Sequence, residues 1–313
     1  MAKVTVIGAG NVGATCANIL AFNRVVSEVV MLDVVEGIAE GKAIDMLQTT
    51  QTIGFETKIT GVTNDYSKTA DSEVIIITSG IPRRPGMTRE ELIGTNAKVV
   101  RGVVDNCLFY SPSAIFVIVT NPMDTMTYLA LKASGLPKNR VIGMGGLLDS
   151  SRFKYHLCKA LDANTRQIDG IVIGGHGDTT MIPLKRLAKF NCIPVSELLS
   201  PEALDKVVAD TMTSGATLTR LLGTSAWYAP GAAAAYVAQS IVGNYKRLIA
   251  SSVYLEGEFG QEDICIGVPA IVGMYGAEKI LPLELNDEEK DQFARSSDAV
   301  RSTNQVLKEI NVL

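Results

Sequence analysis

The sequence predicts an α/β fold in which an N-terminal doubly wound parallel sheet is followed by an α+β domain. Three observations support this. Short apolar runs rich in β-branched residues alternate with helical segments as far as Gly143. A glycine motif joins the first run to the first helix. Beyond Gly143 the pattern changes to long helices and a later pair of strands, so we expect two domains, 1–144 and 145–313.

The composition is that of a globular protein with a substantial core. Of the 313 residues, 47% are hydrophobic and 20% are charged, and the net charge is −4 without any basic block. These values favour neither a nucleic-acid partner nor an anionic membrane surface. The most apolar window, Ala229–Gly243, is interrupted and is shorter than the roughly 20 residues that cross a bilayer. Because a strand-like segment starts at Lys3, we expect no signal peptide and a cytoplasmic location.

The five cysteines are scattered along the chain and form no C-x-x-C pair. This pattern argues against a disulfide framework and against a zinc site, so we expect reduced thiols in the core and no metal. The cysteines are Cys16, Cys107, Cys158, Cys192 and Cys265.

The first strand, Val4–Ile7, leads directly into a glycine motif and then a helix that reaches Phe22. The first glycine permits a tight turn, the second lets the main chain approach a pyrophosphate, and the third lets helix and strand pack closely. The start of the helix then offers free N–H groups to the phosphates. The motif reads Gly8, Ala9, Gly10, Asn11, Val12, Gly13.

The next strand, Val29–Leu32, ends at Asp33, which lies twenty residues after Gly13. A carboxylate at this place accepts hydrogen bonds from the hydroxyls of an adenosine ribose and repels a 2′-phosphate. The alternative is an acid that merely starts a turn. With strand, motif, helix and acid in register, we predict a Rossmann domain that binds NAD rather than NADP.

Four further apolar runs complete six predicted strands. Because these runs do not alternate with polar residues, they indicate strands buried on both faces of a parallel sheet. Ligands bind beyond the carboxyl ends of such strands, where we find Ser79-Gly80 and Thr120-Asn121-Pro122. The four runs are 58–61, 74–77, 114–119 and 140–143.

A loop between residues 82 and 89 contains Arg83, Arg84 and Arg89, and a helix follows from about Glu90. The loop could be a solvated basic segment. Its place at the ligand-binding end of the sheet favours a second interpretation, since arginine grips carboxylates through paired hydrogen bonds. The loop could then close over an acidic substrate.

The second half offers an acid, an arginine and a histidine that could form a site. Asp149 and Arg152 share one face of a predicted helix and could simply pair with each other at the surface. Alternatively Asp149 accepts a hydrogen bond from His176 while Arg152 grips a substrate carboxylate. We interpret His156, the other histidine, as structural.

His176 lies at a predicted turn where the strand 171–173 breaks and resumes at Met181. The flanking glycines keep bulk away from the ring, so a small molecule could reach it. A histidine in such a turn is often only a solvated loop residue. Proton transfer near neutral pH is the competing role.

The remaining segments predict packed helices, an antiparallel pair of strands and a final helix that begins after an Asn286 cap. We expect the two domains to pack together with the active cleft between them. The segments are helices 201–222 and 228–248, strands 251–255 and 264–268, and a last helix whose buried stripe is Phe293, Val300 and Leu307.

Together these residues give a resemblance over essentially the whole chain. The sequence resembles the malate dehydrogenases of the lactate-dehydrogenase-like type, and five motifs in the same order carry the match. They are Gly8-Ala-Gly-Asn-Val-Gly13, Gly80-Ile-Pro-Arg-Arg-Pro-Gly-Met-Thr-Arg89, Val119-Thr-Asn-Pro122, Leu148-Asp-Ser-Ser-Arg152 and Gly175-His-Gly-Asp178.

The resemblance implies roles for individual residues. His176 would be the catalytic acid and base and Asp149 its partner, while Arg152 would bind the carboxylate beside the reacting carbon. Arg89 would polarise the carbonyl, and Asn121 would position the substrate near the nicotinamide. Lactate enzymes usually have glutamine at the position that matches Arg83. The arginine found there resembles the malate branch of the family. The cofactor contacts implied are the motif 8–13, Asp33, Asn96, Val119 and Asn121.

The chemistry agrees with the resemblance. Oxidising a 2-hydroxy acid needs NAD as hydride acceptor, a base with a suitable pKa and a cation near the developing oxygen charge. Arg83 would face the second carboxylate of malate or oxaloacetate, whereas pyruvate would leave it opposite a methyl group. The resemblance also implies the tricarboxylic acid cycle and a homo-oligomer, with a tetramer favoured over a dimer.

Three alternatives remain open at this stage. An L-lactate dehydrogenase would share every motif except Arg83. A non-catalytic NAD-binding regulator would bind the cofactor without turnover, because Rossmann domains also serve as sensors. An NAD-using glycosidase would be expected to need a metal, for which the sequence offers no convincing ligand cluster.

Overall fold

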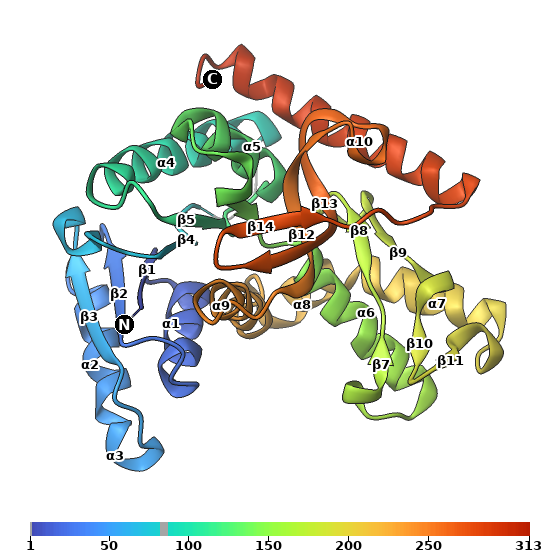
Figure 1. Ribbon diagram of the computed structural model, residues 1–313, viewed down its shortest axis with the longest axis horizontal. Coiled ribbons are helices and arrows are strands. Elements are labelled where there is room, and N and C mark those ends of the chain that lie inside the picture. The colour runs from blue at the N-terminus through green and yellow to red at the C-terminus, as the bar shows by residue number, and fades with distance from the viewer. Residues whose placement is uncertain (1, 82–86) are drawn as a thin grey trace.

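The computed structural model describes residues 2–81 and 87–313 as a mixed α/β structure around one large sheet (Figure 1). Its N-terminal half contains six parallel strands in the order β3-β2-β1-β4-β5-β6. The prediction of a doubly wound parallel sheet is therefore confirmed. These strands are β1 Lys3–Ile7, β2 Glu28–Asp33, β3 Lys58–Thr63, β4 Val74–Ile77, β5 Ile115–Ile118 and β6 Val141–Gly143.

Antiparallel strands of the second half extend the same sheet. Ser252 of β12 pairs with Gly143 of β6, and the order continues through β13, β8 and β9. The predicted antiparallel pair of strands is confirmed as β12 and β13. The strands are β12 Arg247–Glu256, β13 Glu262–Gly273, β8 Val172–Gly174, β9 Met181–Pro183 and β14 Gly276–Ile280, with a separate small sheet of β7 Ile168–Asp169, β10 Lys189–Phe190 and β11 Ile193–Pro194.

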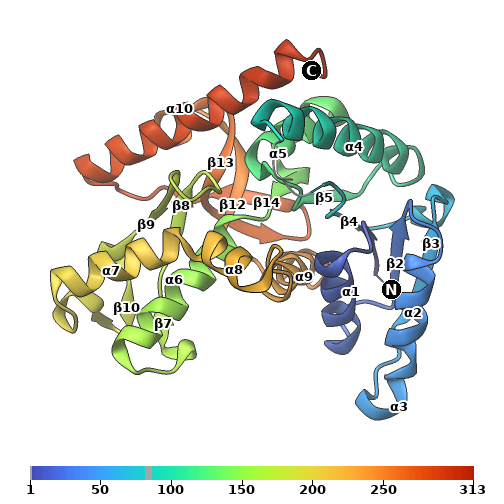
Figure 2. The same cartoon turned by 180° about the vertical axis from the view of Figure 1, so that it is seen from behind.

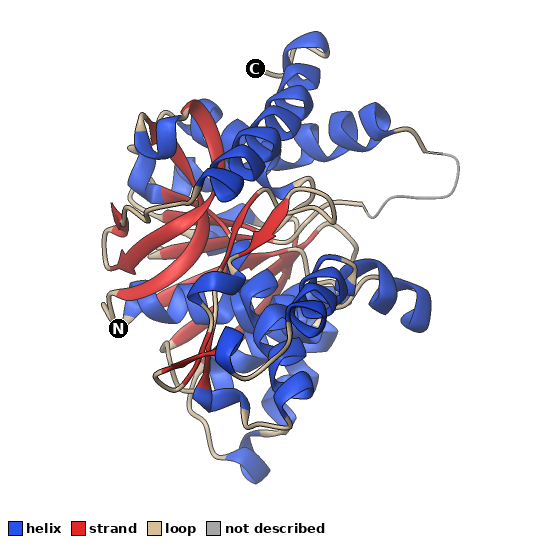
Figure 3. Ribbon diagram, turned by 90° about the vertical axis from the view of Figure 1, so that its right-hand side faces the viewer, coloured by secondary structure: helices blue, strands red, loops and turns tan. Residues whose placement is uncertain are grey.

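Helices cover the sheet on both sides, as the blue ribbons around the red strands in Figure 3 show. The helices are α1 Asn11–Phe22, α2 Ile38–Gln48, α3 Thr50–Ile53, α4 Arg89–Tyr110, α5 Met123–Ser134, α6 Gly146–Leu161, α7 Pro201–Met212, α8 Ser214–Leu222, α9 Tyr228–Val242 and α10 Asp287–Glu309. Short 3₁₀ turns connect several of these elements.

The core of the first half is completed by a helix from the second. Helix α9 lies beside α1 (Figure 2), and its alanine-rich face joins the buried cluster that contains Val4 and Cys16. A Cβ added at Gly231 of α9 would lie 2.6 Å from the Cβ of Thr15 on α1. The alanines and this glycine therefore allow the two helix backbones to approach closely.

Two helices are shorter in the structure than the sequence predicted, so the predicted bounds were wrong. The segment 201–222 breaks at Thr213, where the hydroxyls of Thr213 and Ser214 donate to the carbonyls of Ala209 and Asp210. Such back-bonding competes with the regular helical pattern. The segment 228–248 ends at Val242 because Asn244 adopts a positive φ of 50° and the chain then enters β12.

The final helix and most of the cysteines follow prediction. Asn286 and Glu289 form a reciprocal capping box at the start of α10, and its predicted stripe of Phe293, Val300 and Leu307 is buried. Four cysteines are buried, but Cys192 is exposed, so the expectation of five core thiols was wrong. Within residues 2–81 and 87–313, none of the helices combines the length and apolar character that crossing a bilayer requires.

Candidate active site

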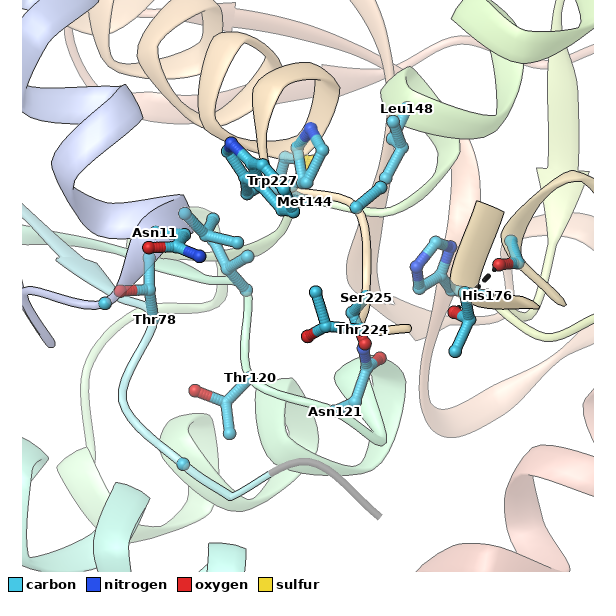
Figure 4. Close-up of a pocket in the computed structure, with 18 of the residues that line it drawn as sticks. Asn11, Thr78, Thr120, Asn121, Met144, Leu148, His176, Thr224, Ser225 and Trp227 are labelled. Atoms are coloured by element: carbon cyan, nitrogen blue, oxygen red, sulfur yellow. Dashed lines mark hydrogen bonds between the residues drawn. The ribbon is translucent and has the colours of Figure 1, made fainter. Parts of the chain in front are cut away.

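A cavity of about 520 Å³ lies where the carboxyl ends of the parallel strands meet the second half of the chain. Figure 4 shows Asn11 and Thr78 at one end, His176 at the other, and Asn121, Thr224 and Ser225 between them. Nine of the predicted site residues that the structure describes line this cavity. They are Gly10, Asn11, Val12, Gly13, Asn96, Val119, Asn121, Arg152 and His176.

The glycine motif forms one end of the cavity. Gly8 has a φ of +99°, and a Cβ on Gly13 would lie 1.9 Å from the carbonyl oxygen of Gly8, so both positions require glycine. A Cβ on Gly10 would meet open space. The N-terminus of α1 carries no side-chain cap and no acidic residue in its first turn. Free N–H groups beside open space fit a pyrophosphate.

Asp33 lies behind this turn rather than in the lining of the cavity. Its carboxylate accepts hydrogen bonds from the main-chain N–H groups of Ala9 at 2.7 Å and Val35 at 3.0 Å. Lys42 donates to the carbonyl of Ala9 at 2.7 Å. These bonds fix the turn while leaving carboxylate lone pairs for further donors. Gly8 and Ala9 do not line the cavity either. They contribute the main-chain structure of the turn.

Asn96 connects two loops that border the cavity. This side chain, 1% exposed, accepts from the N–H of Ile81 at 2.8 Å and donates to the carbonyl of Asn121 at 2.7 Å. The resemblance gave Asn96 as a cofactor contact, and the structure adds that it holds the segment that carries Asn121. Both residues line the cavity, as does Val119.

His176, Asp149 and Arg152 form a connected cluster at the other end. The Nδ1 atom of His176 is 2.7 Å from one oxygen of Asp149, and Arg152 donates to the other oxygen at 3.1 Å. Asp149 is 1% exposed, so its pairing with Arg152 is not the surface pair that spacing alone suggested. Asp149 therefore contacts His176 and Arg152 at the same time. The other ring nitrogen of His176, Nε2, has no hydrogen bond within the part of the chain that the structure describes, so it is available to a ligand.

The turn that carries His176 is held from two helices. It connects the antiparallel strands β8 and β9. The main-chain N–H of His176 donates to Asp124 of α5 at 2.7 Å, and Ser296 of α10 accepts from Gly175 at 2.8 Å and donates to Thr180 at 2.7 Å. These contacts fix the imidazole through its own backbone.

The environment of His176 favours its protonated form. Burial of the ring disfavours the charge, but the nearby charge of Asp149 and its hydrogen bond outweigh this effect, with a further contribution from Asp124. The charge of Arg152 acts in the opposite direction. The net result raises the pKa of His176 above 6.5, which suits a group that exchanges a proton near neutral pH.

The arginines of the predicted loop are only partly accounted for. Arg83 and Arg84 lie outside the described residues. Arg89 begins α4, and its guanidinium donates to the hydroxyl of Thr303 on α10. Arg89 does not line the cavity in this structure. The other histidine, His156, faces the hydroxyl of Ser214 at 2.8 Å and is also absent from the lining.

Sequence reasoning missed several residues of the site. Asp124 gave no signal beyond an acid in the first turn of a helix after Pro122. The lining also contains residues that the sequence analysis did not assign to the site. They include Thr78 after β4, Met144 after β6, and Thr224, Ser225 and Trp227 in the segment before α9. Among the residues with described positions, no group of three or more His, Cys, Asp or Glu side chains is arranged to hold a metal ion.

Two family models match almost the entire chain. The model for the lactate/malate dehydrogenase NAD binding domain matches residues 2–143, and that for the lactate/malate dehydrogenase alpha/beta C-terminal domain matches residues 147–310. The chain is 66% identical over 313 residues to a malate dehydrogenase from Parabacteroides distasonis, covering 100% of both chains. A malate dehydrogenase from Bacteroides fragilis gives the same identity and coverage.

Solved structures of the family share this fold. A malate dehydrogenase from Salinibacter ruber has a TM-score of 0.94 at 42% identity and covers 99% of this chain and 98% of its own. A lactate dehydrogenase from Cryptosporidium parvum, solved with lactic acid and the cofactor NAD, also has a TM-score of 0.94, at 34% identity with 98% of both chains covered. Backbone similarity thus does not separate the two activities. The chain belongs to the lactate/malate dehydrogenase family of NAD-dependent oxidoreductases.

Proposed function

We propose that this protein is an NAD-dependent malate dehydrogenase that interconverts (S)-malate and oxaloacetate, with His176 as acid and base. The observation that carries the proposal is the buried contact between His176 Nδ1 and Asp149 at 2.7 Å, at the end of a cavity that begins at the glycine motif. The 66% identity to malate dehydrogenases supports the choice of substrate.

In the direction of oxidation, His176 accepts the proton of the malate hydroxyl at Nε2. NAD, when bound, would accept the hydride that the carbon loses while the oxygen loses its proton to His176. Asp149 holds the Nδ1 proton, fixes which nitrogen reacts and stabilises the imidazolium that results. In the reverse direction the imidazolium returns the proton to the carbonyl oxygen of oxaloacetate.

Arg152 binds the carboxylate beside the reacting carbon. One of its nitrogens donates to Asp149, while its buried Nε has no partner among the described residues. A buried donor without a partner is costly, and a substrate carboxylate in the cavity would satisfy it. Arg89 polarises the reacting carbonyl and Arg83 binds the distal carboxylate, both on the strength of the family resemblance. For Arg89 this requires release of its contact with Thr303.

The division of labour follows the two halves of the chain. Residues 1–144 bind NAD, residues 145–313 supply most of the catalytic groups, and Asn121 positions the substrate near the nicotinamide. Main-chain N–H groups at the start of α1 would hold the pyrophosphate, and Asp33 would accept hydrogen bonds from the adenosine ribose. The proposed NAD contacts are Gly8, Ala9, Gly10, Asn11, Val12, Gly13, Asp33, Asn96, Val119 and Asn121.

Substrate selectivity tests the proposal directly. We expect steady-state kcat/KM with oxaloacetate to exceed that with pyruvate by about 10³-fold, because pyruvate leaves a guanidinium opposite a methyl group. The variant Arg83→Gln should lose most of this preference, whereas the neighbouring control Arg84→Gln should keep it. A wild-type preference for pyruvate would identify the protein as a lactate dehydrogenase instead.

The protein's setting follows from the family resemblance. We place the enzyme in the cytoplasm and in the tricarboxylic acid cycle, as a homo-oligomer with a tetramer favoured over a dimer. Large apolar side chains exposed on α2, α8 and α9, among them Ile44, Leu221 and Tyr228, support association. Light scattering coupled to gel filtration should give about four times the 33.4 kDa of one chain; a mass of one chain would refute the oligomer.

A further inference from the structure

The N-terminus of α5 brings a second carboxylate against His176. Asp124 lies in the first turn of α5 and is 6% exposed. One oxygen accepts the main-chain N–H of His176 at 2.7 Å. The other oxygen is buried, and the hydroxyl of Ser252 on β12 acts on the carboxylate and lowers the pKa of Asp124. A buried carboxylate with so few donors is costly, so it calls for an explanation beyond anchoring one N–H group.

The charges around His176 suggest that explanation. Asp149 and Arg152 approach the ring from α6, and Asp124 approaches its backbone from α5. With both acids ionised and the ring neutral, this cluster of two acids and one arginine carries a net charge of −1. With the ring protonated the charges balance. In a low-dielectric site such a balance favours the protonated ring.

We propose that Asp124 is a positioning residue for His176, which anchors the main chain of the catalytic turn and whose negative charge favours the protonated ring. This inference rests on the acid–base role proposed for His176. Asp124 does not line the cavity and acts only through the histidine.

Burial raises the pKa of Asp124 above its usual value, and the charge of Asp149 adds to this rise. The N–H of His176, the hydroxyl of Ser252 and the charge of the imidazole favour the ionised carboxylate and limit the rise. The start of a twelve-residue helix also stabilises a carboxylate in its first turn. Among the described residues, Cys265 on β13 is a further titratable group near Asp124, and burial keeps its thiol neutral by raising its pKa.

The chain's two histidines allow a direct measurement. The ring carbon signals of His176 and His156 can be titrated by NMR in protein labelled at histidine, with His156→Gln for assignment. We expect Asp124→Asn, which keeps an acceptor oxygen but removes the charge, to lower the pKa of His176 by about 1 unit. The signal of His156 should titrate as in the wild type, because Ser214 rather than Asp124 faces it.

Kinetic measurements distinguish the effect of the charge of Asp124 from its role in anchoring the turn that carries His176. In Asp124→Asn, kcat/KM for oxaloacetate should fall about tenfold at neutral pH and recover at lower pH, with little change in NAD affinity. Ser296→Ala removes the other anchor of the turn without changing any charge, and should lower kcat at all pH values without moving the pKa of His176. Glu289→Gln, at another buried acid in the first turn of a helix, should change neither the titration nor the rate.

The outcomes distinguish this inference from the proposed function. A folded Asp124→Asn with an unchanged pKa at His176 would overturn the inference, because Asp124 would then be neutral or purely structural. Should that variant fail to fold, Asp124→Ser, which also offers an acceptor oxygen, gives the same test. If the pKa of His176 falls but the pH–rate profile does not follow it, Asp124 acts as inferred and the acid–base role of His176 fails.

Discussion

The two ends of the cavity are built in different ways. The end proposed for the dinucleotide is made of main chain from one short segment, where Gly8, Gly10 and Gly13 shape a turn at the start of α1. The catalytic end is made of side chains from three distant segments, with Asp124, Asp149 and His176 carried by α5, α6 and the β8–β9 turn. The first can be recognised from local sequence, whereas the second depends on how the whole chain folds.

Substitutions at the two ends of the cavity should therefore impair the enzyme in different ways. Substitutions at the catalytic end should remove turnover and leave NAD binding intact. Substitutions at the dinucleotide end should weaken NAD binding or the fold while leaving the proton-transfer groups in place. The four predictions below test this difference, beginning with the largest expected effect.

Replacing His176 should produce the largest loss. His176→Asn removes the proton acceptor, so kcat for malate oxidation should fall by about 10³-fold or more. NADH affinity, measured by fluorescence titration, should stay within about twofold, since the glycine motif is untouched. A variant that retains wild-type turnover would refute the catalytic role.

Asp149→Asn should have a smaller effect at the same end. The amide leaves the imidazolium without its charged partner and permits the wrong ring tautomer, so kcat should fall roughly 10²-fold. Steady-state kinetics at saturating NAD would measure this. A loss confined to KM would instead mean that Asp149 acts mainly through Arg152.

A pair of alanine substitutions tests the dinucleotide end. The Cβ of Gly10→Ala meets open space in the protein, so thermal stability should barely change while the Kd for NAD rises about tenfold or more through contact with the pyrophosphate. The Cβ of Gly13→Ala would lie 1.9 Å from the carbonyl oxygen of Gly8, so the fold should lose about 1–3 kcal/mol. Equal effects of the two changes on Tm would contradict this assignment.

Changes in pH should alter kcat/KM most gradually. In the proposed mechanism oxaloacetate reduction needs protonated His176, whose pKa Asp149 raises above 6.5, so kcat/KM should stay high below that pKa and fall at most tenfold per unit above it. Malate oxidation needs the neutral ring and should rise over the same range. Asp149→Asn should move both midpoints to lower pH; unchanged midpoints would assign the titration to another group.

The parts of the fold that sequence predicts best are those with strong local causes. Apolar runs without alternation identified strands buried on both faces, and the capping box fixed the start of α10 at Asn286. The break at Thr213 was missed because it depends on hydroxyl groups that choose between competing carbonyls. The end of α9 was placed too late because Gly243 and Asn244, where the helix ends, were included in it.

The same reasoning explains what was found and missed at the site. His176 and Asp149 are 27 positions apart, and their contact was inferred from residue type and resemblance rather than from any local pattern. Asp124 could not be identified, since only the packed structure shows that its carboxylate reaches the backbone of His176. The contact of Arg89 with Thr303, more than 200 positions away, is likewise a product of tertiary packing.

The insertion of α9 beside α1 has a consequence for how the protein is made. A fragment that ended after residue 144 would lack Ala234 and Ala238, which pack in the same cluster as Val4 and Cys16. Such a fragment would present an open apolar slot to water and should aggregate. During synthesis the nucleotide-binding half therefore cannot complete its hydrophobic core until the ribosome has released most of the second half.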